Sequence, residues 1–183
     1  MAHVMYSGKM ISDQIDAYLT NGVAKEDLYD GTLVALGDLV ADTTYAETGD
    51  VQYDVYEAAK ATAADAEVGI IDYAGISEGE IAGNEYKMGY KLYNLAVPAG
   101  TNFRVRRLNL HDKFWVGTDN FEGKTAPVVG EFAAVGANDN VGKFVAAATA
   151  PQAGLAVKVL VEKDLTTGMR SQGKIYLVEV VQL

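Results

Sequence analysis

The chain has no cysteine, and only two histidines and three prolines occur among its 183 residues. Without cysteine it has no disulfide, no thiolate ligand for a metal and no thiol nucleophile. No segment approaches the roughly 20 continuous apolar residues of a membrane-spanning helix. The first ten residues lack the basic region and apolar core of a signal peptide. We therefore expect a soluble protein made in the cytoplasm, with no cofactor and no membrane partner.

Basic residues are scarce in the first half of the chain. Residues 1–100 carry 17 acidic and 5 basic side chains, whereas residues 101–183 carry 8 acidic and 10 basic side chains, and the net charge is −10. This excess of negative charge argues against general binding to nucleic acid. The uneven distribution favours association of acidic with neutral or basic surfaces. The alternative is that acidic loops only keep an apolar protein in solution.

Short apolar runs separated by turn residues fill the chain from Phe103 onward. The runs KFWVG, GEFAAVG, GKFVAAA and GKIYLVEVVQL are bounded by Gly, Asn-Asp or Pro, at a spacing typical of all-β folds. The sequence predicts a mainly β domain over residues 32–183, an antiparallel β-barrel or β-sandwich. Further strands are expected at residues 32–40, 69–76 and 86–97. The last run is apolar on both faces, which predicts a central strand.

Helical patterns are confined to short segments. Residues 1–31 are predicted to form an N-terminal arm, in which Ser12 caps a helix that places Ile11, Ile15, Tyr18 and Leu19 on one face. A second short helical pattern covers residues 23–31. One additional short helix is expected in the alanine-rich segment 54–67, because Asp54 and Glu57 have capping-box spacing. The apolar stripe of the arm either packs on its own domain or docks on a neighbouring protein.

The few reactive side chains do not form a recognisable catalytic motif. His111 and Asp112 are adjacent, and consecutive residues of a strand point to opposite faces, so they do not suit an oriented base. Asp119 and Glu122 are the candidates for a carboxylate-based enzyme. The oxygen-rich segments 119–123 and 138–140 lack the spacing of a calcium loop and are typical of turns. We expect no catalytic residue and no bound metal.

Three further residues are candidates for an interface. Arg104 and Arg106 share one face of a predicted strand, where they either meet an acidic partner or pair within the chain. Trp115 alternates with Phe114 and Val116, so it is either part of the core or an exposed anchor for binding. The 11 tyrosines also suit a carbohydrate-binding module, in which aromatic faces stack on sugars, as well as protein interfaces.

From about Gly31 the chain resembles the small capsid-associated structural proteins of tailed bacteriophages. The segments that carry this resemblance are GTLVALGDLV, the alanine-rich segment, YKMGYKLYNLAVPAGTNFRVRRL, KFWVGTDNF and TAPQAGLAVKVL. The resemblance implies a β-rich decoration or auxiliary head protein, without catalytic residues, that binds the major capsid protein. It also implies a location in the virion capsid, after assembly in the host cytoplasm.

These observations together predict a non-enzymatic structural protein. It would attach in many copies, or as a homo-oligomer, to the repeating lattice of the shell. The expected contact residues are Ile11, Ile15, Tyr18, Leu19, Arg104, Arg106 and Trp115. The alternative is a carbohydrate-binding or receptor-binding module of a virion, in which Trp115 and exposed tyrosines are the stacking platforms.

Overall fold

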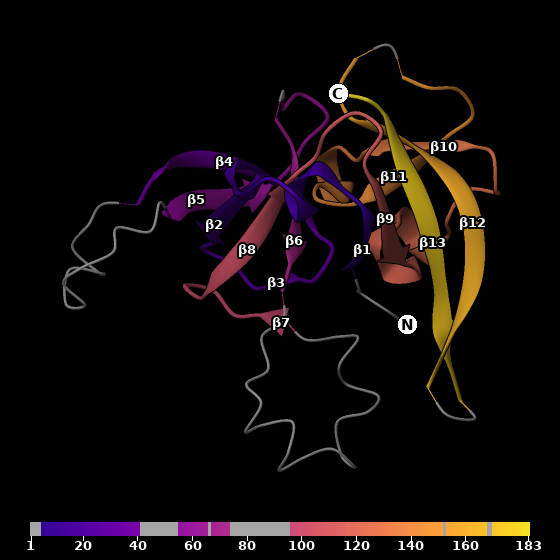
Figure 1. Cartoon of the computed structure of the whole chain (residues 1–183), viewed down its shortest axis with the longest axis horizontal. Helices are drawn as coiled ribbons and strands as arrows, with labels where there is room; N and C mark the ends of the chain where they lie inside the picture. The colour runs from indigo at the N-terminus through magenta and orange to yellow at the C-terminus, as the bar shows by residue number, and fades with distance from the viewer. Residues whose placement is uncertain (1–4, 41–54, 66, 74–95, 152, 168–169) are drawn as a thin grey trace.

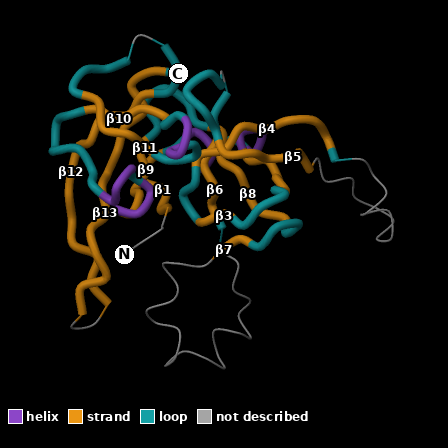
Figure 2. The backbone as a smooth tube through the Cα atoms, turned by 180° about the vertical axis from the view of Figure 1, so that it is seen from behind, coloured by secondary structure: helices purple, strands orange, loops and turns teal. Residues whose placement is uncertain are grey.

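The computed structural model describes residues 5–40, 55–65, 67–73, 96–151, 153–167 and 170–183. It is mainly β, which confirms this part of the predicted fold class. Five strands close into a barrel in the order β2-β5-β4-β6-β8, and six form an open sheet in the order β1-β9-β13-β12-β10-β11. Figure 1 shows the barrel strands on one side of the molecule and β9 to β13 on the other, and Figure 2 shows the same separation from behind.

The barrel contains one parallel pair, β2 with β5, while its other pairs are antiparallel. Its strands are β2 (Leu19–Val23), β4 (Leu33–Leu39), β5 (Val55–Lys60), β6 (Gly69–Asp72) and β8 (Asn102–Arg107). A small two-stranded sheet is formed by β3 (Leu28–Tyr29) and β7 (Ala96–Val97). A Cβ atom at Gly22 would lie 3.0–3.2 Å from side chains of Phe103, Val105 and Ala58, so the barrel interior has no space for a side chain there.

The open sheet is antiparallel throughout. Its strands are β1 (Met5–Lys9), β9 (Lys113–Gly117), β10 (Phe132–Val135), β11 (Phe144–Ala147), β12 (Ala156–Thr167) and β13 (Arg170–Gln182). Strand β13 lies between β9 and β12, so the C-terminal run is central, as its two apolar faces predicted. Short 3-10 helices connect the strands: η1 (Ile11–Asp13), η2 (Asp16–Tyr18), η6 (Thr118–Asn120), η7 (Glu122–Lys124) and η8 (Asn138–Asn140).

Two apolar cores hold the fold together. Successive residues of a strand face opposite sides, so β4 and β6 contribute Val34 and Ile71 to the barrel interior and Leu33 and Ile70 to a second core. This second core fills the space between the barrel and the inner face of the open sheet. An aromatic cluster belongs to it, in which the Phe144 ring centroid lies 5.6 Å from that of Phe121 and 6.4 Å from that of Phe114.

The predicted helices are not confirmed. Segment 54–67 contains β5, because Val55, Ala58 and Ala61 are buried and the barrel needs a strand between β2 and β4. Helix propensity is a weak preference that such tertiary contacts override. The helix expected from Ser12 to Leu19 is replaced by η1, η2 and the start of β2, and residues 23–31 contain β3 in place of a helix. The predicted strand at 86–95 lies outside the described residues.

The N-terminal segment takes part in both sheets. Strand β1 pairs with β9, and β2 pairs with β5 and β8. Met5, Met10 and Ser12 are buried. Residues 5–23 therefore pack on their own chain, which is the first of the two alternatives left open for the arm.

Asp30 links the barrel to the open sheet. Its Oδ2 accepts a hydrogen bond from the backbone N–H of Met5 at 2.8 Å, and its Oδ1 accepts one from the N–H of Tyr73 at 2.9 Å. Its carbonyl accepts a bond from the Asn120 side chain at 3.0 Å. Burial raises the pKa of the Asp30 carboxyl from its ordinary value of 3.8 to about 7. The negative charge of the nearby Asp72 also raises this pKa, whereas the hydrogen bonds from backbone N–H groups lower it.

Candidate protein interaction surface

The outer face of the open sheet carries an apolar row that crosses three strands. Trp115 of β9 pairs with Leu177 of β13, which in turn pairs with Val161 of β12. Directly paired residues of antiparallel strands project to the same face. Phe114 and Val116, on either side of Trp115, are fully buried in the core, so the row faces outward. Trp115 and Leu177 are half-buried and Val161 is 43% exposed; we call these three residues the apolar row.

A charged row runs beside the apolar row. Its members are paired in register across four strands: Phe132 with Lys158, Lys158 with Glu179, and Glu179 with Lys113. The Lys158 Nζ atom lies 5.8 Å from the centroid of the Phe132 ring, and the Lys113 Nζ atom lies 3.8 Å from Glu179 Oε2. This row holds two lysines and one glutamate, so the edge of the apolar row beside it carries a net positive charge.

The hairpin of β12 and β13 extends past the rest of the sheet (Figures 1 and 2). Strand β9 pairs with β13 only at Ile175–Glu179, and β10 pairs with β12 only at Ala156–Lys158. Residues 164–167 of β12 and 170–174 of β13 pair in the ladder only with each other in the described chain. Unpaired strand edges are templates for further pairing, and an isolated two-stranded ribbon is marginally stable in water. We call these residues the free ribbon.

The four arm residues that the sequence placed on one helix face are separated in the structure. Ile11 and Ile15 are 37% and 49% exposed. Tyr18 and Leu19 are half-buried, and Leu19 pairs with Arg106 of β8 inside the barrel sheet. The structure therefore leaves two apolar arm side chains, Ile11 and Ile15, open to solvent.

Arg104 and Arg106 of β8 pair within the chain. Arg106 Nε lies 2.7 Å from Asp72 Oδ2, and its Nη1 lies 2.7 Å from Asp13 Oδ1 and 3.1 Å from Ser12 Oγ. Its side chain is only 11% exposed, so it holds η1 against the barrel. Arg104 is more than half exposed and lies 3.9 Å from Asp72.

His111 and Asp112 have separate structural roles. The buried Asp112 side chain accepts hydrogen bonds from the backbone N–H groups of Ile11 and Asn109, each at 2.8 Å. His111 Nδ1 lies 3.3 Å from Glu179 Oε1 on the exposed side of the sheet. Asp112 therefore fixes the turn before β9 and joins it to η1.

The other oxygen-rich segments form short 3-10 turns. Glu122 Oε1 accepts a hydrogen bond from Asn140 Nδ2 at 2.5 Å, which ties η7 to η8. Asp119 and Asn120 in η6 are buried. In the part of the chain that the structure describes, no group of three or more His, Cys, Asp or Glu side chains could hold a metal ion.

The comparisons with known proteins returned no match among family models, curated proteins or solved structures. Among the described residues, no helix has the length and apolar character needed to cross a membrane. Of the residues predicted for an interface, only Trp115 lies in the apolar row. Sequence reasoning missed Val161 as its neighbour because a register shift between Val159 and Val161 interrupts the alternation of β12.

Proposed function

We propose that the chain is a non-enzymatic structural protein of a bacteriophage virion, which attaches to the major capsid protein as a decoration or auxiliary head protein. The observation that carries this proposal is the apolar row, which is partly exposed on the outer face of the open sheet and leads into the free ribbon. Exposed apolar patches with a polar rim mark protein interaction sites. The bacteriophage assignment itself rests on the sequence resemblance.

The size of the apolar row indicates how such attachment would work. Complete burial of Trp115, Leu177 and Val161 would contribute on the order of 3–6 kcal/mol, because the first two are already half-buried. The loss of translational and rotational freedom on association costs a comparable amount. One apolar row is therefore too small for tight binding by itself. Strand pairing at the free ribbon, repeated over many copies on a lattice, would supply the rest of the binding free energy.

The charged row specifies the chemistry of the partner surface. Lys113 and Lys158 lie along one side of the apolar row, and both are paired in register with Glu179. A shell surface with apolar side chains at its centre and carboxylates along one rim would match this arrangement. Such rim charges mainly set the association rate and its dependence on salt. We expect attachment to weaken as the ionic strength rises.

Two lysine substitutions test the proposal. Val161→Lys places a charge in the apolar row, and Leu39→Lys is the matched control, because Leu39 is 56% exposed on the barrel. Each variant is mixed with shells assembled from the major capsid protein of the same virion, and attachment is measured by co-sedimentation. We expect Val161→Lys to weaken attachment at least tenfold while Leu39→Lys binds normally. Equal attachment of both variants, or no attachment of the unaltered chain, would refute the proposal.

Heat resistance of the shell is the functional readout. Many bound copies stabilise the assembled shell because they bind only that state. Shells that carry the chain should therefore disassemble at a higher temperature than bare shells, and the Val161→Lys variant should lose this effect.

A further inference from the structure

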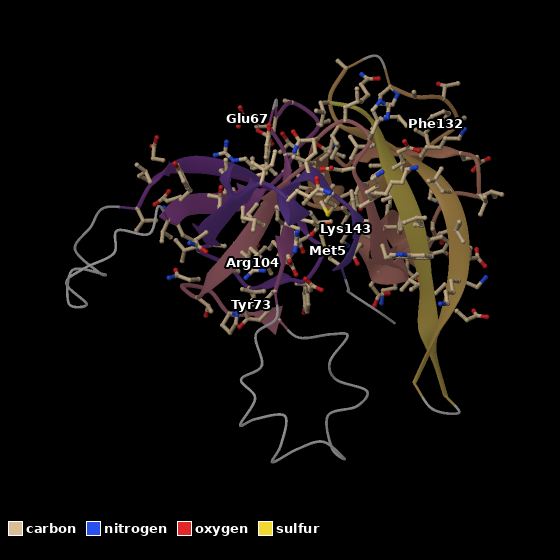
Figure 3. The ribbon with its side chains drawn as sticks, in the orientation of Figure 1. Met5, Glu67, Tyr73, Arg104, Phe132 and Lys143 are labelled. Atoms are coloured by element: carbon tan, nitrogen blue, oxygen red, sulfur yellow. The ribbon has the colours of Figure 1, made fainter. Side chains whose placement is uncertain are left out.

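A small pocket lies at the junction between the barrel and the connections of the open sheet. It has a volume of about 230 Å³. Its lining includes Tyr29 of β3, Lys60 at the end of β5, Asp119 of η6 and Lys143, the residue before β11. Figure 3 shows Lys143 near the middle of the molecule. The pocket is separate from the apolar row.

Backbone hydrogen bonds fix the walls of this pocket. The N–H of Leu33 donates to the Gly142 carbonyl at 2.9 Å, and the N–H of Gly142 donates to the Ala61 carbonyl at 2.8 Å. Gly142 has φ of +76°, and a Cβ atom there would lie 3.0 Å from both Lys60 Cγ and Thr32 Cγ2. The absence of a side chain at position 142 therefore keeps the pocket open, and its shape exists before any ligand arrives.

Two of the four charged residues that line the pocket already have partners. Lys60 Nζ lies 2.6 Å from Glu26 Oε2, and Asp27 Oδ1 accepts a hydrogen bond from the N–H of Ala99 at 2.9 Å. Asp119 and Lys143, by contrast, form no ion pair with any described residue. Asp119 is only 5% exposed. A buried carboxylate is costly without hydrogen-bond donors, so this wall is suited to a ligand that donates hydrogen bonds.

The lining excludes several classes of ligand. Two lysines and two aspartates line the pocket, so their charges balance and neither a phosphate nor a metal cation is favoured. The volume is below the 300 Å³ or more that is usual for drug-sized molecules. A ligand of this size must offer both donors and acceptors, because Asp119 accepts hydrogen bonds and Lys143 donates them.

We propose that this pocket binds one neutral saccharide residue. Its hydroxyl groups would donate to the Asp119 carboxylate and accept from the Lys143 ammonium. The Tyr29 side chain, 40% exposed at the pocket, would cover the apolar C–H face of the sugar ring. This site differs from Trp115, the stacking platform that the sequence suggested, since Trp115 lies beside Leu177 and Val161 in the apolar row. The chain would then hold a glycan at one place and a protein surface at another.

Ligand-observed NMR with the methyl glycosides of glucose, galactose, mannose and N-acetylglucosamine tests the proposal. A single preformed site of this size should bind one of them with a Kd on the order of 1 mM. The variants are Lys143→Met, which removes a donor, and Tyr29→Leu, which removes the ring. Lys163→Met on the exposed part of β12 is the matched control. Circular dichroism and thermal unfolding first establish that each variant is folded.

We expect at least tenfold weaker binding for Lys143→Met and for Tyr29→Leu, and unchanged binding for Lys163→Met. The proposal is wrong if none of the four glycosides binds, or if both pocket variants bind as tightly as the unaltered chain. Displacement of the glycoside by millimolar inorganic phosphate or Ca²⁺ would also overturn it, because the pocket would then be an ion site. Attachment to shells should be unaffected by the pocket variants, so the two proposals fail separately.

Discussion

The carboxyl group of Asp30 should make the stability of the fold depend on pH. Its pKa is raised from 3.8 to about 7 by burial at the junction of the two sheets. Between these values the folded chain keeps a proton that the unfolded chain has released. The free energy of unfolding therefore falls as the pH rises, by up to about 1.4 kcal/mol per unit. From pH 5 to pH 7 the Asp30 contribution is at most about 2–3 kcal/mol, and it levels off above pH 7.

The matching experiment compares the unaltered chain with Asp30→Asn. The variant cannot titrate at this position. Its free energy of unfolding should therefore not show the fall between pH 5 and pH 7.5 that Asp30 causes in the unaltered chain. At pH 5 the variant should be about 1–3 kcal/mol less stable than the unaltered chain, because its amide NH₂ group faces one of the two backbone donors, the N–H groups of Met5 and Tyr73. This difference should shrink as the pH rises, because only the unaltered chain loses the Asp30 contribution. Urea unfolding monitored by tryptophan fluorescence, at half-unit steps of pH, gives both quantities.

The control for this experiment is Asp27→Asn. Asp27 is exposed and bonds to the N–H of Ala99, so its replacement should keep the slope of the unaltered chain. If the unaltered chain and Asp30→Asn show the same slope, Asp30 is ionised in the folded state across this range. The two backbone donors would then outweigh burial, and the reasoning above would be refuted.

Further predictions concern the ion pairs and the cores. Arg106→Ala should lower the free energy of unfolding by about 3 kcal/mol in urea titrations, because it removes the cation that lies 2.7 Å from both Asp72 and Asp13 and leaves Asp72 only the more distant Arg104, whereas Arg106→Lys should lose less. Phe144→Ala should cost about 3–5 kcal/mol through the cavity it leaves beside Phe121; a loss below 1 kcal/mol would contradict the assigned core. Deletion of residues 175–183 should abolish soluble folding, since it removes most of the central strand β13, and a truncated chain that unfolds cooperatively would disprove this.

The strands of the second half could be predicted from the sequence because their signals are local. Alternation in KFWVG placed Phe114 and Val116 on the face opposite Trp115, and the structure buries both. Turn residues bounded β9, β10 and β11 closely. The last run is apolar on both faces, which also predicted the central place of β13. A strand with one face in solvent would instead alternate apolar and polar residues. These inferences depend only on the period of two along a strand.

The first half could not be predicted in the same way, because its structure depends on distant partners. An alanine-rich sequence favours a helix in isolation, but β5 is a strand because β2 and β4 bond to both of its edges. The stripe of Ile11, Ile15, Tyr18 and Leu19 fits a helix, but Arg106 and Asp112 hold η1 and β2 in other conformations.

The sequence by itself determined the strand positions from Lys113 onward, the mainly β class and the absence of cysteine chemistry, because composition and local alternation are properties of the chain alone. Only the tertiary structure decided which residues meet. Val161 joins Trp115 through strand pairing and a register shift. Asp119 and Lys143 come together at a pocket from separate loops, and Asp30 acquires its raised pKa from the junction of two sheets. Such contacts depend on the register and closure of the sheets, which no local pattern specifies.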